Sequence, residues 1–194
     1  PRVIITSSEV HNPQSPGGKV GELADLGNLE GLFSGKGFKM INGSSLFNAD
    51  KAYKDSKLCN ILFSRELYKR LLLAGKNIPV LAWAPGLIIP RNNDGFFRYS
   101  RQYNEIGQRL FAFIARDLLK ITETELNAGN ILASLAIDQQ YSTRKFSYRS
   151  NRILRPGKKI FEESEISKEA HNDLIAKRLW ERCSELTKVS CELK

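Results

Sequence analysis

The sequence predicts an α/β fold, in which helices flank a parallel sheet. Two short apolar runs, residues 2–6 and residues 78–84, have the composition of buried parallel strands. Between them, residues 50–74 have apolar positions that recur at helical spacing. A chain of 194 residues that is 41% hydrophobic is also large enough to bury a core as one globular domain.

The first strand ends at Ser7 and Ser8, and a long loop follows it. Residues 9–48 are rich in Gly, Ser and Asn and show little periodicity, which predicts a loop that crosses the substrate side of the sheet. The helix over residues 50–74 then ends at Gly75, a residue type that often terminates helices.

The second strand turns into a loop at Pro85 and Gly86, and three further elements are predicted after it. These are a helix over residues 123–137, a strand over residues 145–150 and a helix over residues 167–188 with Ser167 as its N-cap. The apolar side of the last helix is expected to contain Ala170, Leu174, Leu179, Cys183 and Leu186. The segment from residue 96 to residue 120 is rich in aromatic rings, which either pack in the core or cover a flat ligand. They belong to Phe96, Phe97, Tyr99, Tyr103, Phe111 and Phe113.

Tyr53 and Lys57 are the strongest candidates for chemistry. Residues four apart on a helix share one face, so the hydroxyl and the ammonium can point into one pocket. A phenol releases its proton poorly at neutral pH, and a neighbouring cation favours the phenolate, which makes the phenol a better general acid. The same spacing also occurs in helices where a half-buried tyrosine simply lies beside a solvated lysine.

Ser8 and the Pro85-Gly86 turn follow the two predicted strands at their carboxyl ends. Ligands of open α/β sheets bind beyond these ends. We therefore expect the Ser8 hydroxyl to meet a substrate carbonyl or the Tyr53 oxygen.

A strand that ends at Ser8, a helix with Tyr53 and Lys57, and a strand that ends at Pro85-Gly86 follow one another in this chain. This order resembles the C-terminal half of a Rossmann-like short-chain dehydrogenase/reductase. More narrowly, the chain resembles the light-dependent protochlorophyllide reductases. The resemblance covers nearly the whole chain, and the long interval between Ser8 and Tyr53 is similar to an insertion of that family. The similar segments are His11-Asn12-Pro13, Gly17-Gly18-Lys19, residues 25–31, residues 51–57 with Cys59-Asn60, and residues 178–186. The resemblance implies that residues 1–194 are the C-terminal part of a single domain, a fragment whose sheet lacks its N-terminal half and the glycine-rich phosphate loop.

The resemblance also implies an activity: NADPH delivers a hydride to a carbon–carbon double bond of a tetrapyrrole, and Tyr53 supplies the proton. Lys57 would assist Tyr53 and bind the nicotinamide ribose, and Ser8 would orient the phenol or the substrate. The residues that choose between NADPH and NADH would lie in the absent half. Illumination of the bound pigment would start the reaction, as in chlorophyll biosynthesis for photosynthesis.

Further ligand contacts follow from the same resemblance. The turn after the second strand would bring backbone close to the nicotinamide through Pro85, Gly86, Leu87 and Ile88. His11 and Cys59 would contact the substrate, although a packing histidine and a structural thiol are the alternatives for these two residues.

The sequence departs from the family directly after Gly86. The family has a cysteine and a later threonine there, whereas this chain reads Leu87-Ile88-Ile89-Pro90. Two alternatives therefore stay open. One is a dark short-chain reductase that acts on a hydrophobic carbonyl such as a retinoid, and the other is an inactive protein that binds a nucleotide or a pigment.

Charge and cysteine usage restrict the other function classes. The net charge is +9, but Lys and Arg are interleaved with Glu and Asp, so we expect a small-molecule substrate and no nucleic acid. A basic cluster is expected on a solvated loop with Pro156-Gly157, where contact with anionic lipid or a pigment carboxylate is the alternative. It consists of Arg149, Arg152, Arg155, Lys158 and Lys159.

The three cysteines have no Cys-x-x-Cys spacing, so no zinc site is expected. Both a cytoplasmic and a thylakoid or plastid location fit, and peripheral membrane association and oligomer formation are left open.

Overall fold

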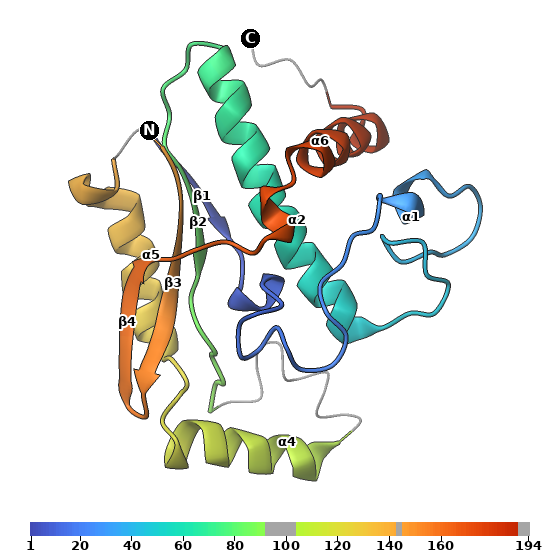
Figure 1. The fold of residues 1–194 in the computed structure, drawn as a ribbon. Coiled ribbons are helices and arrows are strands. Elements are labelled where there is room, and N and C mark those ends of the chain that lie inside the picture. The colour runs from blue at the N-terminus through green and yellow to red at the C-terminus, as the bar shows by residue number, and fades with distance from the viewer. Residues whose placement is uncertain (92–103, 143–144, 190–194) are drawn as a thin grey trace.

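The computed structural model describes residues 1–91, 104–142 and 145–189. At its centre is a four-stranded sheet in the order β1-β2-β3-β4 (Figure 1). The strands are Val3–Thr6, Val80–Ala84, Phe146–Arg155 and Lys158–Glu163. β1, β2 and β3 are parallel, and β4 is antiparallel to β3. The predicted α/β fold with a mostly parallel sheet and flanking helices is confirmed.

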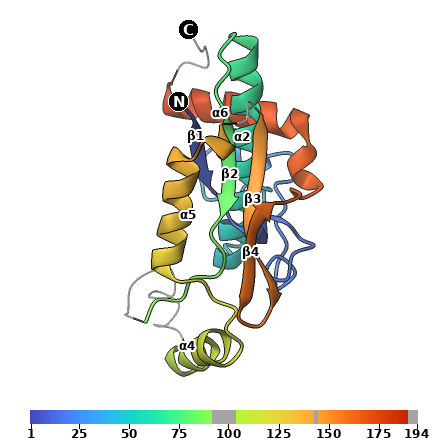
Figure 2. The same ribbon diagram turned by 90° about the vertical axis from the view of Figure 1, so that its left-hand side faces the viewer.

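β2 is buried along its whole length because helices cover both faces of the sheet (Figure 2). Leu81 and Trp83 point to one face, where they pack with Leu135 of α5, which spans Glu125–Ile137. Ala82 and Ala84 point to the other face, toward α2 and α6. This alternation explains the continuous apolar run in the sequence of β2.

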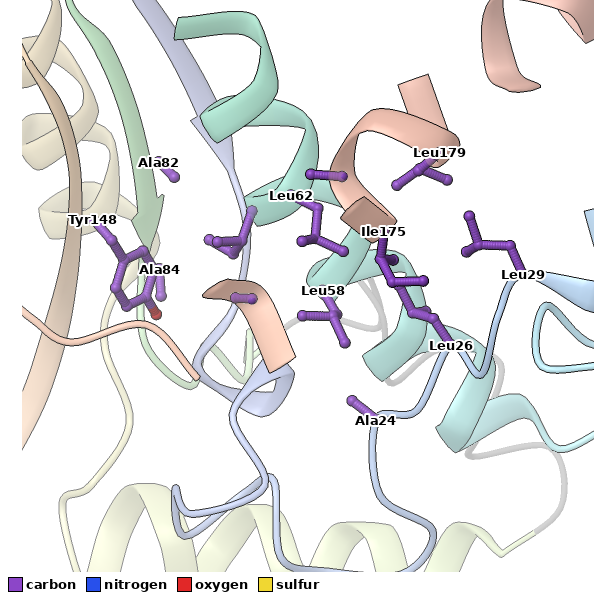
Figure 3. Packing of buried hydrophobic residues seen from close by; sticks show 13 residues of the cluster. Ala24, Leu26, Leu29, Leu58, Leu62, Ala82, Ala84, Tyr148, Ile175 and Leu179 are labelled. Atoms are coloured by element: carbon purple, nitrogen blue, oxygen red, sulfur yellow. The ribbon is translucent and has the colours of Figure 1, made fainter. Parts of the chain in front are cut away.

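α2 spans Ala49–Leu73 and covers the face of the sheet opposite to α5. Asn48 caps it by accepting a hydrogen bond from the Lys51 amide, and Gly75 follows its end with a positive φ of 68°. Leu58 and Leu62 pack between β2 and α6 in the largest cluster of buried side chains (Figure 3). The predicted helix over residues 50–74 is confirmed.

The segment between β1 and α2 is the predicted long loop. Its regular elements are one short turn of 3₁₀ helix, η1 at Glu9–His11, and one short α-helix, α1 at Glu30–Phe33. Ala24, Leu26 and Leu29 are buried in the same cluster as Leu58 (Figure 3). The loop is therefore packed onto α2 and α6 by apolar side chains.

The basic cluster lies on a β-hairpin and not on a loop, so that prediction is wrong. β3 continues past the predicted strand to Arg155, and β4 returns from the turn at Pro156-Gly157, where Gly157 has a φ of 73°. Three of the basic residues form ion pairs with acidic neighbours. The pairs are Arg149–Glu163, Arg152–Glu162 and Lys159–Glu123.

The last helix, α6, spans Asp173–Thr187 and begins later than predicted. Asn172 is its N-cap, while Ser167 accepts a bond from the Ala170 amide at the preceding 3₁₀ turn, η4 at Glu169–His171. Leu174 and Leu186, which were expected on the apolar side, are 65% and 54% exposed. The buried residues of α6 are Ile175, Ala176 and Leu179.

The segment after β2 contains α4 at Glu105–Ala112 and a π-helical turn, η2, at Phe113–Leu118. Phe111 and Phe113 are exposed, so these two rings do not belong to the core. The other four aromatic residues of the predicted segment, at positions 96, 97, 99 and 103, lie outside the described residues. In the part of the chain that the structure describes, no helix has both the length and the apolar composition that a bilayer span requires.

Candidate active site at the carboxyl edge of the sheet

The register of the sheet brings the ends of β1 and β2 level with the middle of β3. Thr6 pairs with Trp83, and Ala84 pairs with Ser150. The residues that follow these pairs, Ser7-Ser8, Pro85-Gly86 and Asn151, therefore lie along the carboxyl edge. This edge is where open α/β sheets bind their ligands.

Tyr53 and Lys57 lie together on one face of α2. The Lys57 ammonium nitrogen is 5.2 Å from the centroid of the Tyr53 ring, within the range of a cation–π contact. Both side chains are half-buried. The structure thus places both residues on one face of α2, as their spacing predicts, while the shared pocket and the chemical role stay predictions.

The end of β1 is tied to this part of α2 by side chains from both elements. The Ser7 hydroxyl donates to the Lys57 carbonyl oxygen at 2.9 Å, and the Asn60 amide donates to the Thr6 carbonyl oxygen at 3.0 Å. From β2, the Trp83 indole N–H donates to the Thr6 hydroxyl oxygen at 3.0 Å. These bonds fix the Tyr53 turn of the helix next to the carboxyl edge.

Ser8 follows this junction directly and is half-buried. Its hydroxyl oxygen accepts a long hydrogen bond of 3.5 Å from the Val10 amide and so caps η1. The predicted role of Ser8 beside Tyr53 or the substrate stays a prediction.

Sequence reasoning assigned no role to Ser7, Asn60 or Trp83. Asn60 had a usable signal, because it lies three residues after Lys57 and hence on a neighbouring part of the same helix face. Ser7 and Trp83 had none, since their contacts depend on strand register and on where the helix packs.

Two buried lysines hold the first turns of α2 against the loop. Lys54 is 1% exposed; its ammonium pairs with Asp50 at 2.8 Å and donates to the backbone carbonyl oxygens of Glu22, at 2.8 Å, and Val20. Lys51 pairs with Asp55 at 2.8 Å and donates to the Asp25 carbonyl oxygen at 2.6 Å. We call this group the helix clamp. Its members are Asp50, Lys51, Lys54 and Asp55.

Asp55 is the buried carboxylate of the helix clamp. Besides the bond from Lys51, one of its oxygens accepts from the Asp25 amide at 2.9 Å. Burial raises the pKa of Asp55 above its ordinary value, because the bonds from Lys51 and the Asp25 amide offset only part of the desolvation.

The turn after β2 presents backbone to the same edge. Gly86 has a φ of 93°, a conformation that a side chain disfavours, so glycine permits the sharp change of direction after Pro85. The Glu123 amide donates to the Leu87 carbonyl oxygen at 2.7 Å, within a short parallel bridge between Ile88 and Glu123. The four residues predicted to contact a cofactor are therefore consecutive members of one braced turn.

His11 occupies a packing position. It is 1% exposed; its Nδ1 is 2.7 Å from the Ser8 carbonyl oxygen, and its Nε2 accepts from the Ser167 amide at 3.3 Å. Burial lowers the pKa of His11, so the ring is neutral with its proton on Nδ1. The geometry favours the packing alternative, and a substrate contact by His11 stays a prediction.

Cys59 lines an apolar cavity of about 820 Å³ between α2, α6 and the long loop. On α2 it shares this cavity with Ala52, Asp55, Ser56, Asn60 and Phe63. Asn60 borders the face of Tyr53 and Lys57, whereas the position of Cys59 in the helical repeat is on a different side of the helix. Burial raises the pKa of Cys59 to about 12, so the residue stays a thiol near neutral pH. The structure therefore separates Cys59 from the Tyr53–Lys57 pair, and its predicted substrate contact stays a prediction.

Within residues 1–91, 104–142 and 145–189, no group of three or more His, Cys, Asp or Glu side chains is arranged to hold an ion. The carboxyl edge presents a phenol next to an ammonium, two serines at the end of β1 and the turn after β2.

Several curated proteins are similar to this chain, although no protein family model matches it. The chloroplastic protochlorophyllide reductase of Marchantia paleacea is 32% identical over 191 residues, which are 96% of this chain and 39% of the relative. Protochlorophyllide reductase A of Oryza sativa is 30% identical over 95% of this chain and 46% of its own length. Protochlorophyllide reductase A of Arabidopsis thaliana is 30% identical over 93% of this chain and 42% of its own length. The chain therefore spans less than half the length of these three relatives.

One solved structure resembles the fold. It is that of an uncharacterized protein from Mycobacterium paratuberculosis, with a TM-score of 0.58 and 24% identity over 99% of this chain and 52% of the other. At this identity the likeness supports the Rossmann-like architecture alone.

Proposed function

We propose, from the premise that this chain is a relative of the protochlorophyllide reductases over nearly its whole length, that it carries the proton-donating part of an NADPH-dependent reductase. The proposed substrate is a tetrapyrrole pigment, in which a carbon–carbon double bond is reduced. Tyr53 donates the proton, and Lys57 stabilises the phenolate that remains.

The observation that carries this proposal is the Lys57 ammonium 5.2 Å from the Tyr53 ring centroid, next to the carboxyl edge of the sheet. An ammonium at this position favours the negative charge that develops on the phenol oxygen as its proton leaves. The bonds from Ser7 to the Lys57 carbonyl and from Asn60 to Thr6 keep this face of the helix at the strand ends.

The turn after β2 is the proposed contact for the nicotinamide. In the parallel bridge with Glu123, the hydrogen bond runs through the Leu87 carbonyl oxygen, so the N–H and C=O of Ile88 point to the opposite side. A primary carboxamide offers one acceptor and two donors to such a backbone edge. Pro85, Gly86, Leu87 and Ile88 would hold this end of the cofactor, and Lys57 would bind its ribose. When bound, the cofactor supplies the hydride.

Location and association are parts of the same proposal. The named relatives are chloroplastic, which supports a plastid location, and the exposed apolar residues of α4 and η2 fit peripheral contact with a membrane. Cell fractionation tests the first point, and sedimentation with lipid vesicles tests the second.

The central experiment assays the complete protein with NADPH and protochlorophyllide, in light and in darkness. Turnover that requires illumination supports the proposal. Dark turnover of a hydrophobic carbonyl such as a retinoid would instead support an ordinary short-chain reductase. Binding of NADPH or pigment without conversion would support an inactive relative.

Replacement of Tyr53 tests the proton donor directly. Tyr53→Phe removes only the hydroxyl. We expect product formation to fall about 100-fold or more, because a general acid typically contributes at least this factor to a rate. NADPH binding is expected to stay within about twofold of the wild-type value. Tyr68→Phe makes the same chemical change on the same helix and serves as the matched control. Turnover of Tyr53→Phe equal to that of the control would remove Tyr53 from the mechanism.

A further inference from the structure

Three polar side chains that the proposed chemistry does not use meet behind the turn after β2. Glu123 lies in the loop before α5, Asn151 on β3 and Lys159 on β4. Glu123 and Asn151 are buried, and the Asn151 amide donates to a Glu123 carboxylate oxygen at 2.6 Å. The Lys159 ammonium is 3.2 Å from the other carboxylate oxygen. We call these three residues the turn brace.

The turn brace contacts the turn along its whole length. The Asn151 amide donates to the Pro85 carbonyl oxygen at 3.2 Å. At Gly86, the position where a Cβ would stand is 3.6 Å from the Asn151 Cβ, so the glycine lies in contact with that side chain. The Glu123 backbone then bonds to Leu87 and pairs with Ile88. Pro85 and Gly86 thus contact Asn151, and Leu87 and Ile88 contact the backbone of Glu123.

The carboxylate of Glu123 is well compensated despite its burial. It accepts from Asn151, Lys159, Asn127 and the Thr124 amide, and the last of these bonds is 2.8 Å long. Burial alone would raise the pKa of Glu123, but these hydrogen bonds outweigh burial and hold the pKa below its ordinary value. Lys159 also donates to the Thr122 carbonyl oxygen, so its ammonium restrains the backbone just before the bridge.

The turn brace restricts the nearby backbone more strongly than an exposed ion pair would. A buried carboxylate is costly unless its lone pairs are satisfied, and a fully satisfied network restricts its members to one geometry. Here the restricted backbone includes the turn after β2, in which the Leu87 carbonyl oxygen accepts from the Glu123 amide and Ile88 pairs with Glu123. The network therefore sets where the N–H and C=O of Ile88 lie.

We infer that Glu123, Asn151 and Lys159 are positioning residues, which hold the turn from Pro85 to Ile88 in the conformation that accepts the nicotinamide of the cofactor. The inference rests on the proposed function, because it assumes that a nicotinamide binds at this turn. None of the three residues needs to touch the cofactor; Glu123 and Lys159 act through the backbone of Leu87 and Ile88.

The test compares NADPH binding by the complete wild-type protein with binding by Glu123→Gln and Glu162→Gln. Glu162→Gln makes the same chemical change on the same sheet, in an exposed pair with Arg152. We expect Glu123→Gln to raise the Kd for NADPH about tenfold, because small misplacements of a binding group weaken productive contacts by this order, and Glu162→Gln to stay within about twofold. Binding is measured where urea unfolding curves show that all three proteins are fully folded.

A second measurement separates positioning from a merely structural role. Amide hydrogen exchange in Glu123→Gln is expected to be faster at Leu87 to Ile89 while exchange in α2 is unchanged. The pigment, which would contact other residues, is expected to bind with the wild-type affinity. Equal weakening of NADPH and pigment, or unchanged exchange in the turn, would overturn the inference.

Lys159→Met gives an independent variant in case Glu123→Gln folds poorly. Its side chain is 20% exposed, so its removal disturbs packing less, and we expect the same selective rise in the Kd for NADPH. Wild-type protein that binds no NADPH would overturn the proposed function and this inference together. If the wild-type protein binds NADPH and both Glu123→Gln and Lys159→Met bind it with the same Kd, this inference alone would be overturned.

Discussion

The helix clamp takes all four of its charged side chains from α2, whereas the turn brace takes its three from a loop and two strands. In the clamp, the partners of the lysines are carboxylates four residues away and backbone carbonyls of residues 20–25. In the brace, each bond joins residues that are 28 or more positions apart in the chain, apart from the local bonds of Thr124 and Asn127.

This difference suggests separate tasks for the two groups. The clamp attaches a long loop to the helix that carries Tyr53, so its loss should mainly affect folding. The brace adjusts one turn of a sheet that is already held by β1, β2 and β3, so its loss should mainly affect binding at that turn.

Lys54→Met should give the largest loss of stability. It leaves the carbonyl oxygens of Val20 and Glu22 without their donor, and we expect the free energy of unfolding to fall by roughly 3 kcal/mol. Urea unfolding measures this loss. The control is Lys177→Met, which breaks an exposed i,i+4 pair with Glu181 and should cost less than about 0.5 kcal/mol.

Lys159→Met should cost less stability than Lys54→Met, roughly 1–2 kcal/mol, because Glu123 keeps its bonds from Asn151 and the Thr124 amide. The same urea unfolding assay checks this value. A larger loss of stability than that of Lys54→Met would contradict these separate tasks, since the turn brace would then be the main support of the fold.

The pH dependence of stability should have opposite signs in the two groups, with a smaller effect than either lysine replacement. Burial raises the pKa of Asp55 above its ordinary 3.8, so the native state takes up this proton first and the contribution of Asp55 to stability grows as the pH falls toward that value. For Glu123, hydrogen bonds outweigh burial and hold the pKa below the ordinary 4.5. Below that value the unfolded chain binds a proton that the native state does not, so the contribution of Glu123 is lost as the pH falls.

Urea unfolding of wild type, Asp55→Asn and Glu123→Gln between pH 7 and about pH 4 checks these signs. On acidification, wild type should gain stability relative to Asp55→Asn and lose it relative to Glu123→Gln. Parallel curves for the two variants would show that the two carboxylates do not differ in this way.

The sequence was sufficient where one local pattern determines the structure. The apolar runs of β1 and β2 and the helical period of α2 predicted the central elements, and the four-residue spacing predicted that Tyr53 and Lys57 share a face. The predicted resemblance to the protochlorophyllide reductases is confirmed by relatives that match 93–96% of the chain.

The sequence was not sufficient for β4, for the start of α6 and for the turn brace. β4 has the sequence Lys158-Lys159-Ile160-Phe161-Glu162-Glu163, in which four of six residues are charged and none is buried. Its composition therefore predicts a solvated loop. The start of α6 was misplaced because Ser167 and Asn172 are both good caps, and only packing decides between them. The turn brace was not predictable, since its members come together only through strand register.

The two tryptophans of this chain give it two separate optical reporters. Trp83 is buried in the sheet, with its indole N–H bonded to Thr6 at the strand ends. Trp180 stacks on Phe63 at a centroid distance of 5.0 Å, beside the apolar cavity. Fluorescence of a Trp180→Phe variant would therefore follow events at the strand ends, and that of a Trp83→Phe variant would follow the contact between α2 and α6.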